Sequence, residues 1–185
     1  MLIKPLLVEP DETALMRVGQ NLALLSHCFD MTGVFDDLAV VQFLNNHPRV
    51  DRILHSIDSR DANGRVLFQA VEDGTGYVTL RNISEHHTVV EEILTQFAQE
   101  LEEKTGWRID SNVDLILLPA LTSSALDAHF DIVINVYGNL EVMLRDEESV
   151  SLPCDRLLSS YPKGIVSIQG IDDVNLALVS KLSAC

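Results

Sequence analysis

His129 and Asp131 are the residues of this 185-residue chain whose types and spacing most directly suggest chemistry. They flank Phe130 in a β-prone run, and side chains two apart on a strand project from the same face. An imidazole and a carboxylate on one face supply two ligands of a facial site of the kind that holds non-haem Fe(II). The motif is short, and a histidine on a strand is more often hydrogen-bonded structure than a ligand, so its context has to decide.

A third protein ligand would fix the facial geometry, and no histidine follows His129 in the sequence. Three upstream histidines could reach the site, and three basic residues could bind the carboxylate of a co-substrate. The histidines are His55, His86 and His87, and the basic residues are Arg145, Arg156 and Lys181. His86 and His87 directly precede a predicted helix, where exposed polar residues are common, so exposure is favoured over metal binding for both.

Two helices are predicted ahead of a strand-rich remainder. Apolar residues recur at helical intervals over residues 13–28, and residues 36–45 begin with two aspartates and end before Pro48. No repeat or linker divides the chain. We therefore expect a single domain over residues 1–185, with a helical N-terminal extension at 1–48 and a strand-rich barrel at 49–185.

Short β-prone runs separated by turn residues dominate the remainder. They are residues 50–58, 65–71, 77–82, 113–118, 130–137, 140–144, 156–160, 165–169 and 174–182. One helix interrupts them at 88–105, where Thr88 and Glu91 form a capping box, an apolar stripe runs from Val90 to Leu101, and Gly106 follows as the C′ residue. Many short strands at this spacing predict a mostly β, α+β fold built on a barrel or sandwich.

Several short pieces occur in a definite order along the chain. They are residues 76–82, the helix at 88–105, residues 112–119, His129-Phe130-Asp131 with the apolar strand up to Gly138, residues 152–158 and the Tyr161-Pro162-Lys163-Gly164 turn. Over residues 35–182 this series resembles the cupin-fold, JmjC-related oxygenases, which include ribosomal-protein hydroxylases. The resemblance implies a double-stranded β-helix, or jelly-roll, barrel. It also implies an Fe(II) held by the His-x-Asp pair and a distant histidine, with 2-oxoglutarate anchored by a basic side chain.

The chain departs from the family pattern in three places. Ser167 stands close to the position of the missing distal histidine, and Gly138-Asn139-Leu140 replaces the basic stretch that would anchor the co-substrate. The spacing from His129 to Gly138 is also shorter than in the family. Ala125-Leu126-Asp127 is therefore an alternative position for the metal strand, with His129 only resembling the motif. Fe(II) held by one histidine and one aspartate alone would be labile.

The chain is acidic, with 13 Lys and Arg against 28 Asp and Glu and a formal net charge of −15. Neutralising a phosphate backbone needs clustered basic residues, so no nucleic-acid partner is expected. The N-terminal run contains Pro5, Glu9 and Pro10, which argues against a signal peptide or a membrane span there. We therefore expect a cytoplasmic protein with no membrane partner.

Two functions follow from these observations. The first, favoured by the loss of both the distal histidine and the basic anchor, is a non-catalytic binding module for a peptide or protein partner, or one half of a homodimer. The second is an Fe(II)/2-oxoglutarate-type oxygenase with an altered metal site. In that enzyme His129 and Asp131 would bind the metal, and Arg145 would contact the co-substrate.

Overall fold

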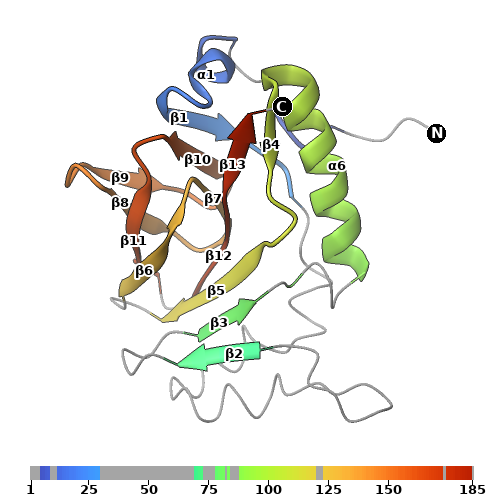
Figure 1. The fold of residues 1–185 in the computed structure, drawn as a ribbon. Coiled ribbons are helices and arrows are strands. Elements are labelled where there is room, and N and C mark those ends of the chain that lie inside the picture. Colours follow the sequence, from blue (N-terminus) through green and yellow to red (C-terminus); the bar gives the residue numbers. More distant parts are fainter. Residues whose placement is uncertain are drawn as a thin grey trace.

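Antiparallel strands make up most of the computed structural model, which describes residues 5–8, 12–29, 69–72, 78–81, 83, 88–119, 123–172 and 174–184 (Figure 1). The helices are α1 (Glu12–Arg17) and α6 (Thr88–Thr105). The strands are β1 (Asn21–Ser26), β2 (Gln69–Glu72), β3 (Val78–Arg81), β4 (Trp107–Ile109), β5 (Asp114–Pro119), β6 (Ser123–Phe130), β7 (Ile132–Tyr137), β8 (Leu140–Leu144), β9 (Ser149–Leu152), β10 (Arg156–Tyr161), β11 (Ile165–Gly170), β12 (Val174–Ser180) and β13 (Leu182–Ala184).

Two sheets form the barrel. The larger has the strand order β1-β10-β7-β12-β5-β3-β2, and the smaller has the order β6-β11-β8-β9. From β5 onward the chain passes back and forth between them, since β5, β7, β10 and β12 belong to the larger sheet and β6, β8, β9 and β11 to the smaller. This winding is a jelly roll, so the predicted fold class is confirmed. A third, two-stranded sheet pairs β13 with β4.

Aliphatic side chains fill the space between the two sheets. The buried members of this inner cluster are Ile116, Leu118, Val133, Leu140, Val142, Leu144, Leu152, Leu158, Ile165, Ile168, Ala177 and Val179. Alternate residues of the larger sheet face the other way, into a second cluster with α6: Leu115 and Leu117 lie in that cluster, whereas Ile116 lies in the inner one. The central strands β5, β7 and β12 of the larger sheet are therefore buried on both faces, which is why they are rich in consecutive apolar residues.

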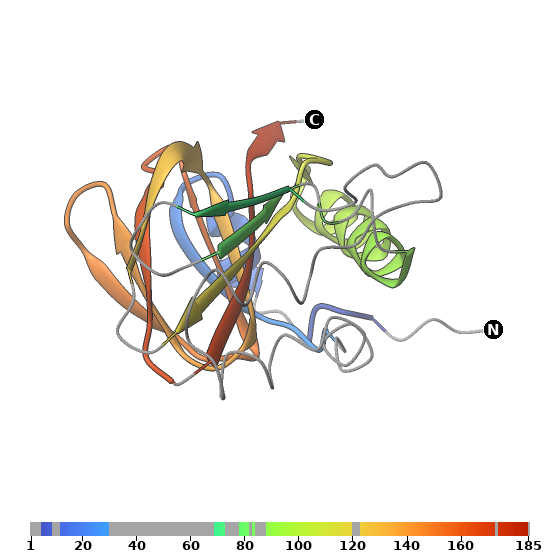
Figure 2. The ribbon, with the colours of Figure 1, turned by 90° about the horizontal axis from the view of Figure 1, so that it is seen from below.

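Helix α6 covers the outer face of the larger sheet. Val90, Leu94, Phe97 and Leu101 are between 0% and 6% exposed, which is the predicted apolar stripe. Burial of each such side chain contributes about 1.5–3 kcal/mol. The helix ends as predicted at Gly106, which has φ 74° and donates its N–H to the Glu102 carbonyl. Both views place α6 and the β8–β9 hairpin on opposite sides of the barrel (Figure 1, Figure 2).

The helix predicted over residues 13–28 is wrong beyond its first turns. Helix α1 ends at Arg17, and the left-handed φ angles of Gly19 (82°) and Asn21 (76°) turn the chain into β1. On β1, Ala23 and Leu25 face the cluster beneath α6, while Leu22 and Leu24 pack against the inner cluster. Leucines that serve two buried faces mimic a helical period, which explains the error.

Two further differences concern the strands. β4, β6 and β9 are strands that the sequence patterns did not predict, and the predicted strand at 130–137 begins only at Ile132 because Phe130 belongs to β6. The predicted strands at 140–144, 156–160 and 165–169 are confirmed almost to the residue. The predicted helix at 36–45 and strand at 50–58 lie outside the described residues.

Candidate functional site

Asp131 lies at the corner where the chain leaves the smaller sheet and enters the larger one, between β6 and β7. Its backbone N–H donates to the Ser180 carbonyl (2.9 Å), and its carbonyl accepts the Ser160 N–H (2.7 Å). Its carboxylate Oδ2 accepts the N–H of Leu182 at 2.9 Å. The residue is 8% exposed. The carboxylate therefore stabilises the start of β13.

The prediction that His129 and Asp131 share one strand is wrong. β6 ends at Phe130, and the change of sheet at Asp131 interrupts the alternation that would place both side chains on one face. The backbone of His129 lies in β6, and its side chain is outside what the structure describes. Metal ligation by this pair stays a prediction.

Four turns of the barrel meet around Asp131 and enclose a cavity of about 250 Å³, which we call the corner pocket. They are the β6–β7, β8–β9, β10–β11 and β12–β13 connections. The lining residues are Asp131, Arg145, Tyr161, Pro162, Lys163, Gly164 and Lys181. Two of the three basic residues singled out from the sequence, Arg145 and Lys181, thus lie in the same pocket as Asp131. The third, Arg156, begins β10 and does not line it.

Close backbone contact positions the cations of the corner pocket. The N–H of Arg145 donates to the Gly164 carbonyl (3.2 Å), which joins the end of β8 to the β10–β11 turn. Gly164 has φ 86°, and a Cβ there would lie 4.0 Å from an Arg145 guanidinium nitrogen. The Lys163 ammonium lies 2.7 Å from an Asp146 carboxylate oxygen and 3.7 Å from one of Glu148.

The ion pair between Lys163 and Asp146 at the edge of the corner pocket shifts the pKa of both groups. The hydrogen bond with Lys163 lowers the pKa of Asp146 below its usual value, and the same bond raises the pKa of Lys163. Asp146 is exposed and Lys163 is half-buried, so water and salt screen much of the attraction. Lys163 is paired with these carboxylates, and Arg145 and Lys181 are exposed at the pocket.

The other residues predicted near a metal take different positions. Ser167 pairs with Ala125 of β6 and with Met143 of β8. Ser167 projects from the face of β11 opposite to Ile168, which belongs to the inner cluster, and its partner Met143 is 40% exposed. Ser167 therefore faces away from the barrel interior. The side chains of residues 125–127 and the whole of His55, His86 and His87 lie outside what the structure describes.

Within the described ranges, no three His, Cys, Asp or Glu side chains are grouped so that they could hold a metal ion. The same part of the chain contains no helix long and apolar enough to cross a membrane.

A buried polar pair that the sequence patterns did not reveal links β1 to β7. The His27 ring nitrogen Nε2 lies 2.7 Å from the Asn135 carbonyl, and Nδ1 accepts the Phe29 N–H at 3.1 Å. The neutral ring with its proton on Nε2 satisfies both contacts. Burial lowers the pKa of His27 below its usual 6.5. Nothing in the local sequence joins residues 108 positions apart, so only the tertiary structure could show this pair.

No protein-family model matches the sequence, and no curated protein is detectably similar to it. Solved structures match well: the 2OG-Fe(II) oxygenase family oxidoreductase from Burkholderia pseudomallei covers 98% of this chain and 95% of its own, with a TM-score of 0.50 and 12% identity. This chain has the fold of the 2-oxoglutarate/Fe(II) oxygenases.

Two further structures agree. The non-haem α-ketoglutarate-dependent carbocyclase SnoK from nogalamycin biosynthesis covers 98% of this chain and 89% of its own (TM-score 0.51, 11% identity). YcfD of Escherichia coli, a ribosomal oxygenase, covers 89% of this chain (TM-score 0.54, 10% identity). This chain spans half the length of that YcfD chain. At such identities the likeness shows the fold, and activity has to be argued from the site.

Proposed function

We propose that this chain is a non-catalytic binding module on the oxygenase barrel, and that its corner pocket binds a carboxylate of a peptide or protein partner. The observation that carries the proposal is the use of the Asp131 carboxylate, which accepts the Leu182 N–H and so stabilises the fold. The described side chains of the neighbouring barrel interior are aliphatic.

The charge of the corner pocket supports a carboxylate as the bound group. Arg145 and Lys181 line it with one acidic residue, Asp131, and with Lys163, whose charge Asp146 and Glu148 offset, in a chain whose formal net charge is −15. A guanidinium can bind a carboxylate through two parallel hydrogen bonds, which fixes orientation as well as charge. The net charge of −15 disfavours anions over the rest of the surface, so a local group of cations is where an anion would bind.

The alternative is an Fe(II)/2-oxoglutarate oxygenase, and the placement of Arg145 in one pocket with Asp131 favours it. The described side chains do not complete a ligand set for iron, because Asp131 is the one candidate donor among them and Ser167 faces outward.

The test measures thermal stability with glutarate, 2-oxoglutarate and Mn(II), each alone and combined. A ligand at one hundred times its Kd stabilises the folded state by about 2.7 kcal/mol, or about 5–11 °C for a domain of this size. We expect both dicarboxylates to raise the Tm without metal, and Arg145→Gln to remove the effect. Arg17→Gln, which removes the same charge from α1, should keep it.

Two results would contradict the proposal. A large Tm increase seen only with Mn(II) and 2-oxoglutarate together, and lost in Asp131→Asn, would support the oxygenase. Asn at position 131 still offers an oxygen to the Leu182 N–H, so this variant removes the charge and keeps the fold contact. No response to either dicarboxylate would overturn the carboxylate site.

A further inference from the structure

A groove with an apolar floor runs along α6, between the helix and the chain from β4 to β5. Its cavity is about 390 Å³. Leu94 and Ala98 of the helix form the floor with Ile109 and Val113 opposite them, and Leu94, Ile109 and Val113 are buried. We call this the α6 groove. Its floor suits one aliphatic side chain, because that side chain would replace water over apolar surface.

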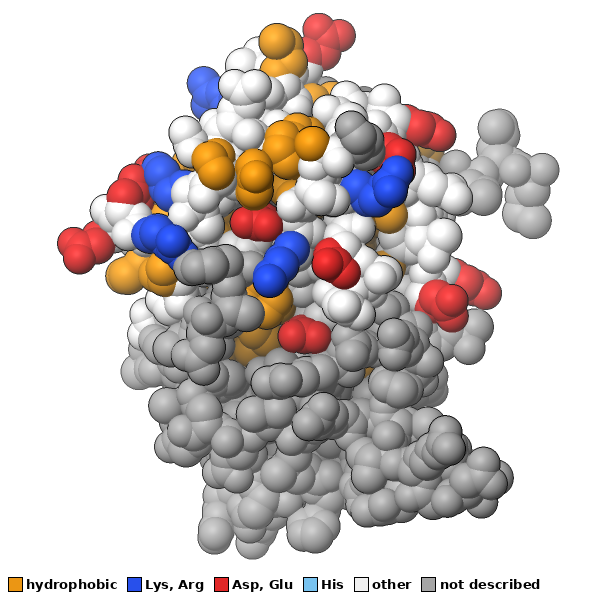
Figure 3. Space-filling model, in the orientation of Figure 1, with side chains coloured by type: hydrophobic (Ala, Val, Ile, Leu, Met, Phe, Trp, Pro, Cys, Tyr) orange, Lys and Arg blue, Asp and Glu red, His pale blue; other side chains and the backbone are white. Residues whose placement is uncertain are grey.

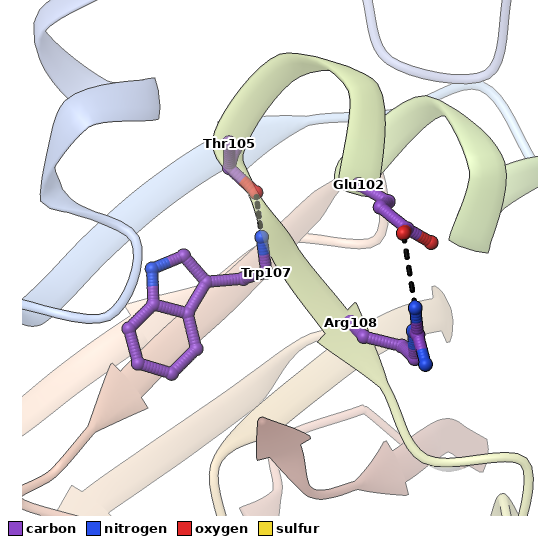
Figure 4. Close-up of polar contacts among 4 residues, drawn as sticks. All are labelled: Glu102, Thr105, Trp107 and Arg108. Atoms are coloured by element: carbon purple, nitrogen blue, oxygen red, sulfur yellow. Dashed lines mark hydrogen bonds and ion pairs between the residues drawn. The ribbon is translucent and has the colours of Figure 1, made fainter. Parts of the chain in front are cut away.

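The rim of the α6 groove is acidic. Glu91, Glu102 and Asp110 line it together with a single cation, Arg108. Figure 4 shows Arg108 of β4 and Glu102 of α6 pointing toward one another, and their side chains meet at 3.1 Å while staying 60% and 43% exposed. With that pair neutralised, two rim carboxylates remain without an opposite charge in the lining.

The size of the groove sets the length of what it can hold. From Glu91 to Glu102 the helix rises about 16 Å, which is the length of about five residues of extended chain. The corner pocket lies near the α6 groove. Asp110, which lines the groove, donates its N–H to the carbonyl of Lys181, which lines the corner pocket, and the β4–β13 sheet lies between the two. Acidic and basic side chains are interspersed with hydrophobic patches over the described part of the face in Figure 3.

We propose that the α6 groove docks a short basic segment of a protein partner, with one aliphatic side chain on the floor and flanking Lys or Arg side chains against the rim. The proposal rests on the proposed binding-module function and names a second surface for the same partner class. Charge complementarity selects this occupant: the rim attracts cations, and the net charge of −15 speeds their approach.

The probe is a fluorescent pentapeptide, Lys-Lys-Leu-Lys-Lys, acetylated and amidated, with binding followed by anisotropy at about 150 mM salt, where long-range charge effects are screened beyond about 8 Å. Two control peptides replace the central Leu by Ser or all four Lys by Glu. The groove variant combines Glu91→Gln with Asp110→Asn. Both substitutions keep the local fold, since Gln also serves a capping box and Asn can still accept the Asn112 N–H that Asp110 holds.

The matched control variant combines Glu92→Gln with Glu103→Gln, which removes the same charge from exposed positions of α6 outside the groove lining. We expect the groove variant to weaken binding of the Leu peptide about fivefold or more and the control less than about twofold. Both control peptides should bind more weakly to the wild type.

Equal losses in the two variants, or equal binding of the Leu and Ser peptides, would overturn the proposal by showing general charge attraction. No binding of the Leu peptide would also overturn it. Arg145→Gln separates this outcome from failure of the proposed function: it should abolish the dicarboxylate effect on Tm and leave binding of the Leu peptide unchanged.

Discussion

Lowering the pH below 6.5 should destabilise this protein through His27 more steeply than through an exposed histidine. The ring is 5% exposed, and its two nitrogens contact the Asn135 carbonyl and the Phe29 N–H. A second ring proton would sit on Nδ1, facing the Phe29 N–H, so two donors would oppose each other. The Phe29 ring also packs edge-on against the imidazole, with centroids 4.7 Å apart.

The direction and size of the change in folding stability with pH follow from the linkage between proton binding and folding. Burial is the main cause that lowers the pKa of His27, and the hydrogen bond to Asn135 and the charge of Asp155 oppose it only in part. The unfolded chain therefore binds this proton at a higher pH than the folded protein does. Stability is complete above the usual pKa of 6.5 and falls with decreasing pH toward the lowered pKa. The maximum slope is about 1.4 kcal/mol per pH unit, or about 3–6 °C in Tm.

Urea unfolding at pH 8.0, 7.0, 6.0 and 5.5 measures the effect, with His27→Gln as the reference. Glutamine keeps a donor for the Asn135 carbonyl and does not titrate in this range. The other histidines are common to both proteins, so their contributions cancel in the difference. We expect the wild type to lose stability relative to the variant as the pH falls below 6.5. A constant difference across this range, or a wild type that gains stability on acidification, would refute the reasoning.

Four substitutions test the packing and the buried hydrogen bonds. Gly19→Ala should destabilise by about 2–5 kcal/mol in urea unfolding, because φ there is 82° and a Cβ would overlap the Trp107 indole. Gly106→Ala, with a similar φ of 74° but open space around it, should cost only about 1–2 kcal/mol, and equal losses would contradict the packing argument. Asn135→Leu should cost about 2–4 kcal/mol, since its buried amide makes three hydrogen bonds, and a neutral result would be inconsistent with them. Ser159→Ala should be neutral or stabilising, because the buried hydroxyl has no partner among the described residues, and a loss above about 1 kcal/mol would contradict this.

Local sequence patterns predicted the elements whose start, apolar pattern and end are all marked by residues within one segment. Helix α6 was predicted from Thr88 to Thr105 because its cap, its apolar stripe and its terminal glycine all lie within that segment. Strands β8, β10, β11 and β12 were likewise predicted, because turn residues bound each of them. The strand spacing alone predicted a barrel or sandwich; the resemblance to the cupin-fold oxygenases implied the jelly roll, which the strand order confirms.

Tertiary structure decided what depends on segments meeting from afar. β1 resembled a helix because its leucines face two separate cores, and only the second core distinguishes the two patterns. His129 and Asp131 were expected to share a face, but a change of sheet between them removes the alternation on which that inference rested. Sequence spacing cannot show where a strand passes to another sheet, because partner strands rather than local propensity decide that point.

For the candidate site, too, the sequence shows the residue types and only the tertiary structure shows which of them meet. Asp131, Arg145 and Lys181 could each be selected by chemical type from the sequence, but their meeting in the corner pocket depends on four turns that the winding of the barrel brings together. The role of Asp131 as acceptor for the Leu182 N–H could not be read from the motif, because that contact joins residues 51 positions apart. The sequence by itself determined which chemical groups this protein has, and the closure of the barrel determined which of them lie together.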